Sequence, residues 1–304
     1  MKEKFWKIAA VFSLVAAIGA CVIAASLVGR IGTLEKNLSH GNSQGEDVTI
    51  ATVESTWNGK TWCSYGDSIT GYNVWQPYVH KALGFAHHYE RGLGSSTYTL
   101  SGQTWYANPD GSYNSRFGFA GVTAAPEGTT EHEGYMCSWD RIKTMIPQNV
   151  DLVVVMAGTN DAGPSISAPL GDLSYPFDET TFMGAVASTV VKIQEWCPQA
   201  TVVLCTPFSG RGAYEDGMTN EQMAANQTAP VYNQIGLTTQ DYAEAVMEVA
   251  EYLSVPCIDV FGNCGVNQFN RNMYLEDLVH PNKEGGKAIA KVIIGGLKTI
   301  APVE

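Results

Sequence analysis

Ser68, Asp277 and His280 are the residues whose types and surroundings suit acyl transfer by a serine nucleophile. Ser68 follows Gly66-Asp67, where an apolar run stops and a helix-like pattern begins. At such a corner the serine N–H lies at a helix N-terminus, where developing negative charge is stabilised. Asp277 precedes His280 by three positions. This spacing lets the carboxylate accept a hydrogen bond from Nδ1 while Nε2 faces the serine.

Each of these motifs also has a purely structural interpretation. Gly, Asp and Ser are common turn residues, and the loop around His280 could simply cap the helix that follows. The remaining histidines are weaker candidates for the base, because they lie in a polar N-terminal region, an expected helix, an expected strand or an acidic loop. They are His40, His80, His87, His88 and His132.

A serine acyl-transfer site also needs hydrogen-bond donors for the oxyanion. The candidates are the N–H of Ser68, a backbone N–H in Gly94-Ser95, and the side-chain amide of Asn160. An amide donor at a strand end is well suited to stabilise a developing negative charge. Asn160 could instead be a helix cap or turn residue.

These candidates stand at the ends of alternating strand-like and helix-like segments. The strand-like runs are 60–65, 86–91, 150–157, 200–206 and 255–260. The helix-like runs are 73–83, 136–146, 179–196, 238–253 and 283–298. Such alternation predicts a parallel sheet with helices on both faces. Ligands of these sheets bind beyond the carboxyl ends of the strands, and there we expect the candidates to meet.

The segment from Ser101 to Tyr135 is expected to be a long loop rich in Gly, Ser and aromatic residues. Loops of this length in a compact domain are usually functional or disordered. Trp105 and Tyr106 could line a site for an acyl or sugar group, or they could attach the loop to the body of the domain. The sequence leaves both interpretations open.

Four motifs, GDSIT, GLGSS, GTND and DLVHPN, follow one another in the order and at the separations of the signature blocks of the SGNH/GDSL hydrolase family. The chain resembles this family over residues 60–300. The resemblance implies Ser68 as nucleophile, His280 as base and Asp277 as its partner. It also implies a flavodoxin-like α/β/α sandwich, with a five-stranded parallel sheet in the order 2-1-3-4-5 and no metal or cofactor.

The same resemblance implies an oxyanion hole formed by Ser68, a residue of the second block and Asn160. The chain departs from the family in that second block, whose fourth residue is commonly glycine but here is Ser95. Either Ser95 or Gly94 therefore supplies the backbone N–H. Three further residues of these blocks are expected to support the site: Asp67, Gly158 and Asp161.

Residues 8–29 form an uncharged apolar stretch, preceded by three lysines and followed by Arg30. This length crosses the hydrocarbon core of a bilayer, and the lysines predict a cytoplasmic amino terminus. We therefore expect a membrane anchor at 1–30, a polar linker at 31–58 and an outward-facing catalytic domain at 59–304. A cleaved signal peptide, or lipidation at Cys21, would instead release or tether the mature protein.

Composition excludes some functions and leaves others open. The 304 residues carry a net charge of −12, which argues against nucleic acid as a partner. Six cysteines lie beyond the apolar stretch, and only Cys257 and Cys264 form a local pair that could be a disulfide. No CxxC, HExxH or other zinc-ligand pattern is present, so a structural zinc is not indicated.

These observations predict a membrane-tethered, outward-facing carboxylic ester hydrolase that forms an acyl-serine intermediate. An aromatic loop near an outward site favours the removal of short acyl groups from glycans. Three alternatives stay open: a lysophospholipase or thioesterase acting on lipids, an acyltransferase to a sugar hydroxyl, and a non-catalytic glycan-binding domain.

Overall fold

A computed structural model describes residues 55–100, 103–108, 127–210 and 231–303. The expected apolar span, 8–29, and most of the expected linker lie outside these ranges. Among the described helices, none is both long enough and apolar enough to cross a bilayer.

Five parallel strands form the central sheet: β1 (Thr61–Gly66), β2 (His87–Gly92), β5 (Leu152–Met156), β6 (Thr201–Cys205) and β7 (Cys257–Ile258). Their order is β2-β1-β5-β6-β7, which confirms the order expected from the sequence. Gly66, the last residue of β1, lies opposite Gly92 of β2 and Met156 of β5. The loops that follow these three strands therefore begin side by side at one edge of the sheet.

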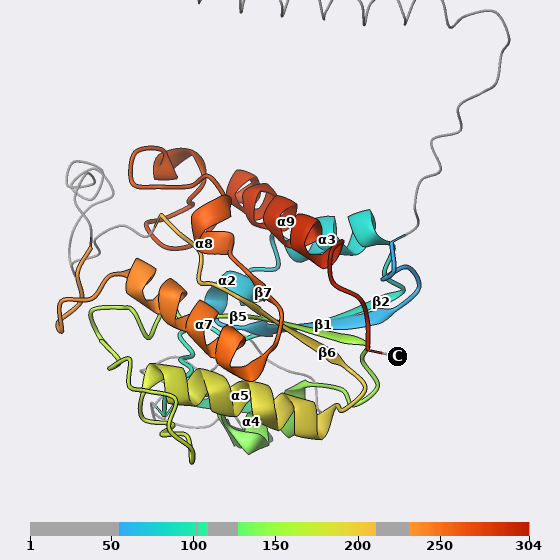
Figure 1. The fold of residues 1–304 in the computed structure, drawn as a ribbon, viewed down its shortest axis with the longest axis horizontal. Coiled ribbons are helices and arrows are strands. Elements are labelled where there is room, and N and C mark those ends of the chain that lie inside the picture. Colours follow the sequence, from blue (N-terminus) through green and yellow to red (C-terminus); the bar gives the residue numbers. More distant parts are fainter. Residues whose placement is uncertain (1–54, 101–102, 109–126, 211–230, 304) are drawn as a thin grey trace, which may run out of the picture. The chain divides into compact units, whose positions relative to one another are not determined.

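Helices cover both faces of this sheet (Figure 1). One face carries α3 (Gln76–Leu83), α8 (Val260–Asn263) and α9 (Lys283–Leu297). The other carries α4 (Trp139–Met145), α5 (Phe182–Trp196) and α7 (Thr239–Leu253). Side chains of a strand alternate between faces, so Val153 and Val155 join one buried cluster while Val154 and Met156 join the other. Strand β5 is covered on both sides, which explains its nearly continuous apolar sequence.

The segment expected to be a loop contains a two-stranded antiparallel hairpin, β3 (Thr104–Ala107) and β4 (Thr130–Glu133). The expectation of a loop over this whole segment was wrong for these residues. Each strand has only four residues, and the TEHE sequence of β4 is poor in the β-branched and aromatic residues that typify strands. The sequence therefore carried little signal for this pairing.

All six cysteines of the described residues are free thiols. The weakly expected Cys257–Cys264 disulfide is not formed, and the Sγ of Cys264 instead lies 2.9 Å from the Oγ of Ser209. Burial raises the pKa of Cys257 to about 12. Cys63 and Cys205 lie fully buried in strands, where a thiol packs as a small apolar group.

Candidate active site

The serine motif forms a short helix, α2 (Ser68–Gly71), directly after β1. Asp67 caps this helix, because its side chain accepts a hydrogen bond of 2.9 Å from the N–H of Ile69. The hydroxyl of Thr70 donates to the carbonyl of Met156 at the end of β5. Ser68 is partly exposed. The nucleophile candidate thus lies at the carboxyl edge of the sheet on a segment attached to two strands.

The carboxyl group of Asp67 is fully buried beneath this turn. Burial is the largest influence on it and raises its pKa to about 6, although the N–H of Ile69 and the nearby His280 act in the opposite direction. Asp67 therefore lies directly beneath the nucleophile candidate, and its hydrogen bond is local to the serine turn.

Ser68, His280 and Asp277 form a continuous hydrogen-bonded chain. The Nε2 of His280 lies 2.9 Å from the Oγ of Ser68, and its Nδ1 lies 2.7 Å from Oδ2 of Asp277. The serine hydroxyl can therefore donate to Nε2 while Nδ1–H donates to the carboxylate. This is the geometry in which an imidazole removes a proton from a serine.

A closed loop presents His280 to the serine. Leu275 and Pro281 form an antiparallel bridge across the base of this loop, and the N–H of Glu276 donates to the carbonyl of His280 at 2.9 Å. Asn282, rather than His280, caps the following helix α9. The capping interpretation of this motif therefore applies to Asn282, and the imidazole is left to face Ser68.

Asp277 is arranged to stay ionised. Partial burial would raise its pKa, but hydrogen bonds from the His280 side chain and from the N–H groups of His280 and Val279 outweigh it and lower the pKa to about 2. Both N–H groups donate to Oδ1 at 2.6 Å. The other oxygen is thus aimed at the imidazole.

The second motif supplies backbone donors beside the serine turn. The N–H of Leu93 donates to the carbonyl of Gly66 at 3.0 Å, which joins this loop to the end of β1. Ser95 has a left-handed backbone with φ of 59°, a conformation in which glycine costs least. Among the described residues, no hydrogen bond engages the N–H of Ser68, Gly94 or Ser95. Within the described protein, each of these three N–H groups therefore has no acceptor.

Asn160 belongs to the same edge. One N–H of its side-chain amide donates to the carbonyl of Ser96 at 2.8 Å. An amide nitrogen has two N–H donors, and among the described residues this is the one hydrogen bond that engages it. The bond to Ser96 fixes the orientation of the amide against the loop that carries Ser95.

Asp161 and Gly158 position these donors. The buried carboxylate of Asp161 accepts hydrogen bonds from the N–H of Tyr98, the N–H of Thr99 and the hydroxyl of Thr99, at 2.9 to 3.1 Å. Gly158 has φ of 108°, and an added Cβ would come within 3.2 Å of the Phe182 ring. The loop that follows β5 therefore needs glycine to turn toward the site.

Trp105 and Tyr106 are buried in the hairpin, with 2% and 6% of their surface exposed. The Trp105 ring stacks on His132, and the Tyr106 hydroxyl donates to Glu131. His132 in turn pairs with Asp140 at 3.0 Å. These contacts favour the interpretation that both aromatic residues attach this segment to the domain.

Two further residues at the site were not anticipated from the sequence. Arg141 of α4 is fully buried and donates to the carbonyl of Gly66 at 2.6 Å, so it anchors the residue just before Asp67. Tyr72 stacks on the imidazole of His280. Its position one helical turn beyond Ser68 is the only feature that could have pointed to it.

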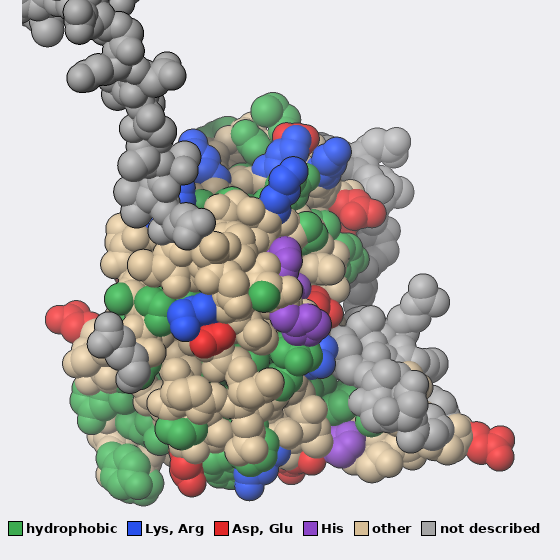
Figure 2. All heavy atoms as spheres, turned by 90° about the vertical axis from the view of Figure 1, so that its right-hand side faces the viewer, with side chains coloured by type: hydrophobic (Ala, Val, Ile, Leu, Met, Phe, Trp, Pro, Cys, Tyr) green, Lys and Arg blue, Asp and Glu red, His purple; other side chains and the backbone are tan. Residues whose placement is uncertain are grey.

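In the part of the chain that the structure describes, no group of three or more His, Cys, Asp or Glu side chains is arranged so that it could hold a metal ion. The histidines outside the site form contacts of their own. The face toward α3 and β2 carries histidine side chains (Figure 2), and His80 and His88 lie near each other there, with ring centroids 6.5 Å apart.

A parallel sheet covered by helices, with a serine, a histidine and a carboxylate hydrogen-bonded at its carboxyl edge, is the arrangement of a serine hydrolase. The sequence profile of the GDSL-like Lipase/Acylhydrolase family matches residues 64–288. The chain belongs to this family, and it is an SGNH-type serine hydrolase. A search of curated proteins gives no significant match.

Solved structures share this fold. A protein from Lactobacillus plantarum is 20% identical, with a TM-score of 0.58, over 80% of this chain and 98% of its own. A possible lipase from Chitinophaga pinensis is 17% identical, with a TM-score of 0.52, over 79% of this chain and 98% of its own. At these identities the likeness concerns the fold.

Proposed function

We propose that this protein hydrolyses carboxylic esters through an acyl-enzyme on Ser68. The observation that carries this proposal is the hydrogen-bonded chain from Ser68 through His280 to Asp277. In the first step Nε2 of His280 takes the hydroxyl proton as Oγ attacks the ester carbonyl carbon. Asp277 holds the imidazole in the required tautomer and stabilises the imidazolium that forms.

The tetrahedral intermediate carries its negative charge on the former carbonyl oxygen. The available N–H of Ser68, an N–H of Gly94 or Ser95, and the second amide N–H of Asn160 would stabilise that charge. The imidazolium then gives its proton to the departing alcohol, and the acyl group stays on Oγ. In the second half-reaction His280 deprotonates a water that attacks the acyl-serine, which releases the acid and restores the serine.

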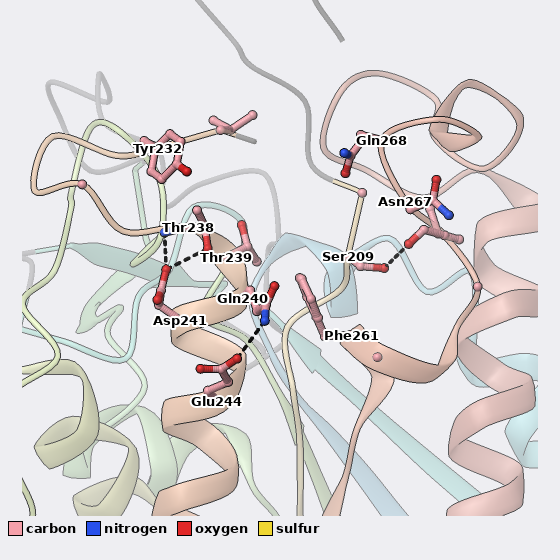
Figure 3. Close-up of a pocket in the computed structure, with 16 residues that line it drawn as sticks. Ser209, Tyr232, Thr238, Thr239, Gln240, Asp241, Glu244, Phe261, Asn267 and Gln268 are labelled. Carbon is pink, nitrogen blue, oxygen red and sulfur yellow. Dashed lines mark hydrogen bonds between the residues drawn. The ribbon is translucent and has the colours of Figure 1, made fainter. Parts of the chain in front are cut away.

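For the substrate we propose esters that join a short acyl group to a glycan. A hollow of about 900 Å³ lies beyond the carboxyl ends of β6 and β7 (Figure 3). Ser68, Asp277 and His280 do not line it. Its described lining has no lysine or arginine, and it offers hydroxyl, amide and carboxyl groups together with the aromatic rings of Tyr232 and Phe261. Such a lining suits an uncharged polyhydroxylated group.

The length of the acyl chain and the nature of the alcohol can be tested together. We expect the full-length protein to hydrolyse p-nitrophenyl acetate faster than the butyrate and octanoate esters, and to release acetate from an acetylated oligosaccharide. A preference for octanoate, or for a lysophospholipid, would favour the lipid acylhydrolase alternative. Transfer of acetyl to an added sugar in preference to water would favour the acyltransferase alternative.

We further propose that residues 8–29 anchor the protein in a membrane with the catalytic domain outside. The proposal is supported by the uncharged length of this stretch and by Lys2, Lys4 and Lys7 before it. An outward position would bring the site to cell-surface glycans. Signal-peptide cleavage and lipidation of Cys21 are the competing possibilities. Membrane fractionation separates a cleaved, soluble protein from the two tethered forms, and detection of a lipid on Cys21 separates those two.

A further inference from the structure

The aromatic ring of Tyr72 lies flat against the imidazole of His280. Their ring centroids are 4.4 Å apart and the planes differ by 7°. Tyr72 directly follows α2, and its N–H donates to the carbonyl of Ser68 at 2.9 Å. The segment that carries the nucleophile therefore also carries the ring that covers one face of the base.

Core packing does not account for this placement, because 46% of Tyr72 is exposed. A ring needed only for burial would not remain half in solvent at a site open to substrate. The contact it makes is with His280, of whose side chain only 22% is exposed. Tyr72 thus removes water from one face of the imidazole.

The groups around His280 come from two segments, its own loop and the serine segment 67–72. Its own loop supplies Asp277 at Nδ1, the serine turn supplies the hydroxyl of Ser68 at Nε2 and the buried carboxyl of Asp67, and the end of α2 supplies the face of Tyr72. Asp277 and Glu276 also lie near the phenol. The edges of the imidazole are thus occupied by hydrogen bonds, and Tyr72 acts on its face.

We propose that Tyr72 is a positioning residue that keeps the imidazole of His280 aimed at Ser68 and stabilises its protonated form. The proposal rests on His280 being the base. The imidazole takes a proton from Ser68 in acylation and passes it to the departing alcohol, then takes a proton from water in deacylation and passes it to the Ser68 oxygen. A cation over an aromatic face is stabilised by the ring quadrupole, so the stack favours both proton-accepting steps.

The phenol itself stays neutral during these steps. Burial raises the pKa of Tyr72, and the carboxylates of Asp277 and Glu276 raise it further. A neutral ring adds no formal charge to the site. Its hydroxyl is therefore not needed for the effect, and phenylalanine should replace it.

The test compares Tyr72→Phe, Tyr72→Leu and Tyr72→Gln in the full-length protein, using p-nitrophenyl acetate over a range of pH. The Phe variant should keep kcat within about 2-fold, because its ring has the same face. The Leu and Gln variants should lose about 3- to 10-fold in kcat with little change in KM. In both, the acid limb of kcat/KM should move to lower pH by about half a unit, because the protonated imidazole is less stable.

Tyr175→Leu is the matched control, since Tyr175 is 82% exposed and its ring contacts Phe177 rather than the site. A purely structural role of Tyr72 would lower kcat without moving the acid limb, and that result would overturn the proposal. So would wild-type kinetics in the Leu and Gln variants. Ser68→Ala is run in parallel: if it stays active, the assignment of the site itself has failed, whereas an inactive Ser68→Ala confines any failure to Tyr72.

Discussion

The Nε2 of His280 lies 2.9 Å from the Oγ of Ser68, although 212 positions separate them in the sequence. The two residues meet because each lies in a loop at the carboxyl edge of the sheet. Ser68 follows β1, and His280 precedes α9, which packs against α3. Their distance therefore depends on the packing of the last helix of the chain against one of the first.

Replacing the nucleophile tests this relationship most directly. Ser68→Ala should lower kcat by about 10³-fold or more without loss of the fold, since the acyl-enzyme cannot form. A fluorophosphonate probe should label the wild type at Ser68 and leave the variant unlabelled. Ser174→Ala, at an exposed serine, is the control and should react normally. Labelling at any other serine would contradict the assignment.

Replacing the base and replacing its carboxylate partner should lower kcat by different amounts. His280→Ala should lower kcat more than Asp277→Asn, because a serine can still use an imidazole that is imperfectly oriented. Asp277, with a pKa of about 2, stays ionised above pH 4, so Asp277→Asn removes its charge throughout that range. Steady-state kinetics between pH 4 and 9 measure the cost of each variant.

His132→Ala is the matched control for the base, because His132 also pairs with a carboxylate, that of Asp140. It should retain near-normal kcat. If His280→Ala remained active and His132→Ala did not, His132 would be the base.

The oxyanion donors can be separated by where their hydrogens come from. Asn160→Ala deletes a side-chain donor and should cost about 10²- to 10³-fold in kcat, or about 2.7–4 kcal/mol, with little change in KM. Ser95 would act through its backbone, so Ser95→Ala and Ser95→Gly should both keep near-normal kcat.

Stability provides a second measurement at Ser95. Its left-handed backbone costs a residue with a Cβ about 1–2 kcal/mol, so Ser95→Gly should not destabilise the protein and could raise its free energy of unfolding by up to about 1 kcal/mol. A large loss of kcat in Ser95→Gly, with Asn160→Ala unaffected, would show that the donors are assigned wrongly.

His88 should make the protein sensitive to acid. The pKa of His88 is lowered from 6.5 to about 3. Burial is the largest cause, and the charges of His80, Arg91 and His87 add to it. The unfolded chain therefore binds a proton below pH 6.5 that the folded chain refuses. This contribution to stability is complete above pH 6.5 and is lost as the pH falls toward 3, by about 2–3 kcal/mol at pH 4.

The acid sensitivity of the wild type is compared with that of His88→Gln. Glutamine does not titrate, and its amide can replace the hydrogen bond between Nε2 and the Ser64 hydroxyl, which is 2.9 Å long in the wild type. Urea unfolding at pH 7, 5.5 and 4 should show the variant gaining on the wild type as the pH falls. The test uses the difference in unfolding free energy between variant and wild type, because other groups also change stability in acid. Asp67 and Asp161 have pKa values raised to about 6, which stabilises the folded protein as the pH falls. His87→Gln, on an exposed neighbour, is the control. Parallel curves for wild type and His88→Gln would refute the prediction.

The proposed anchor predicts behaviour in cells. The full-length protein should fractionate with membranes, and external protease should release an active fragment cut within residues 31–58. The reason is that an uncharged stretch of this length spans a bilayer and the lysines before it stay inside. A soluble mature protein beginning near residue 30 would contradict it, and a lipid on Cys21 would show a different kind of tether.

Patterns in the sequence were enough to predict the parallel sheet and to bring the residues of the hydrogen-bonded chain to its edge. Strands β5 and β6 are apolar runs between turn residues, and parallel strands end at a common edge. Motifs at Ser68, Asn160 and His280 could therefore be placed together before any distance was known. The resemblance to the SGNH/GDSL family supplied the strand order and the roles.

Other features depend on contacts between residues far apart in sequence. From its position in the sequence, Trp105 could be a substrate contact or a buried anchor. Its packing on His132 favours the second interpretation. Ser95 carries no mark of its left-handed backbone, which the surrounding loop imposes. The guanidinium of Arg141 reaches Gly66 from a helix 75 positions away, and the stack of Tyr72 on His280 requires two loops to meet. Local sequence patterns report periodicity and turn chemistry, whereas these contacts arise only when the chain packs in three dimensions.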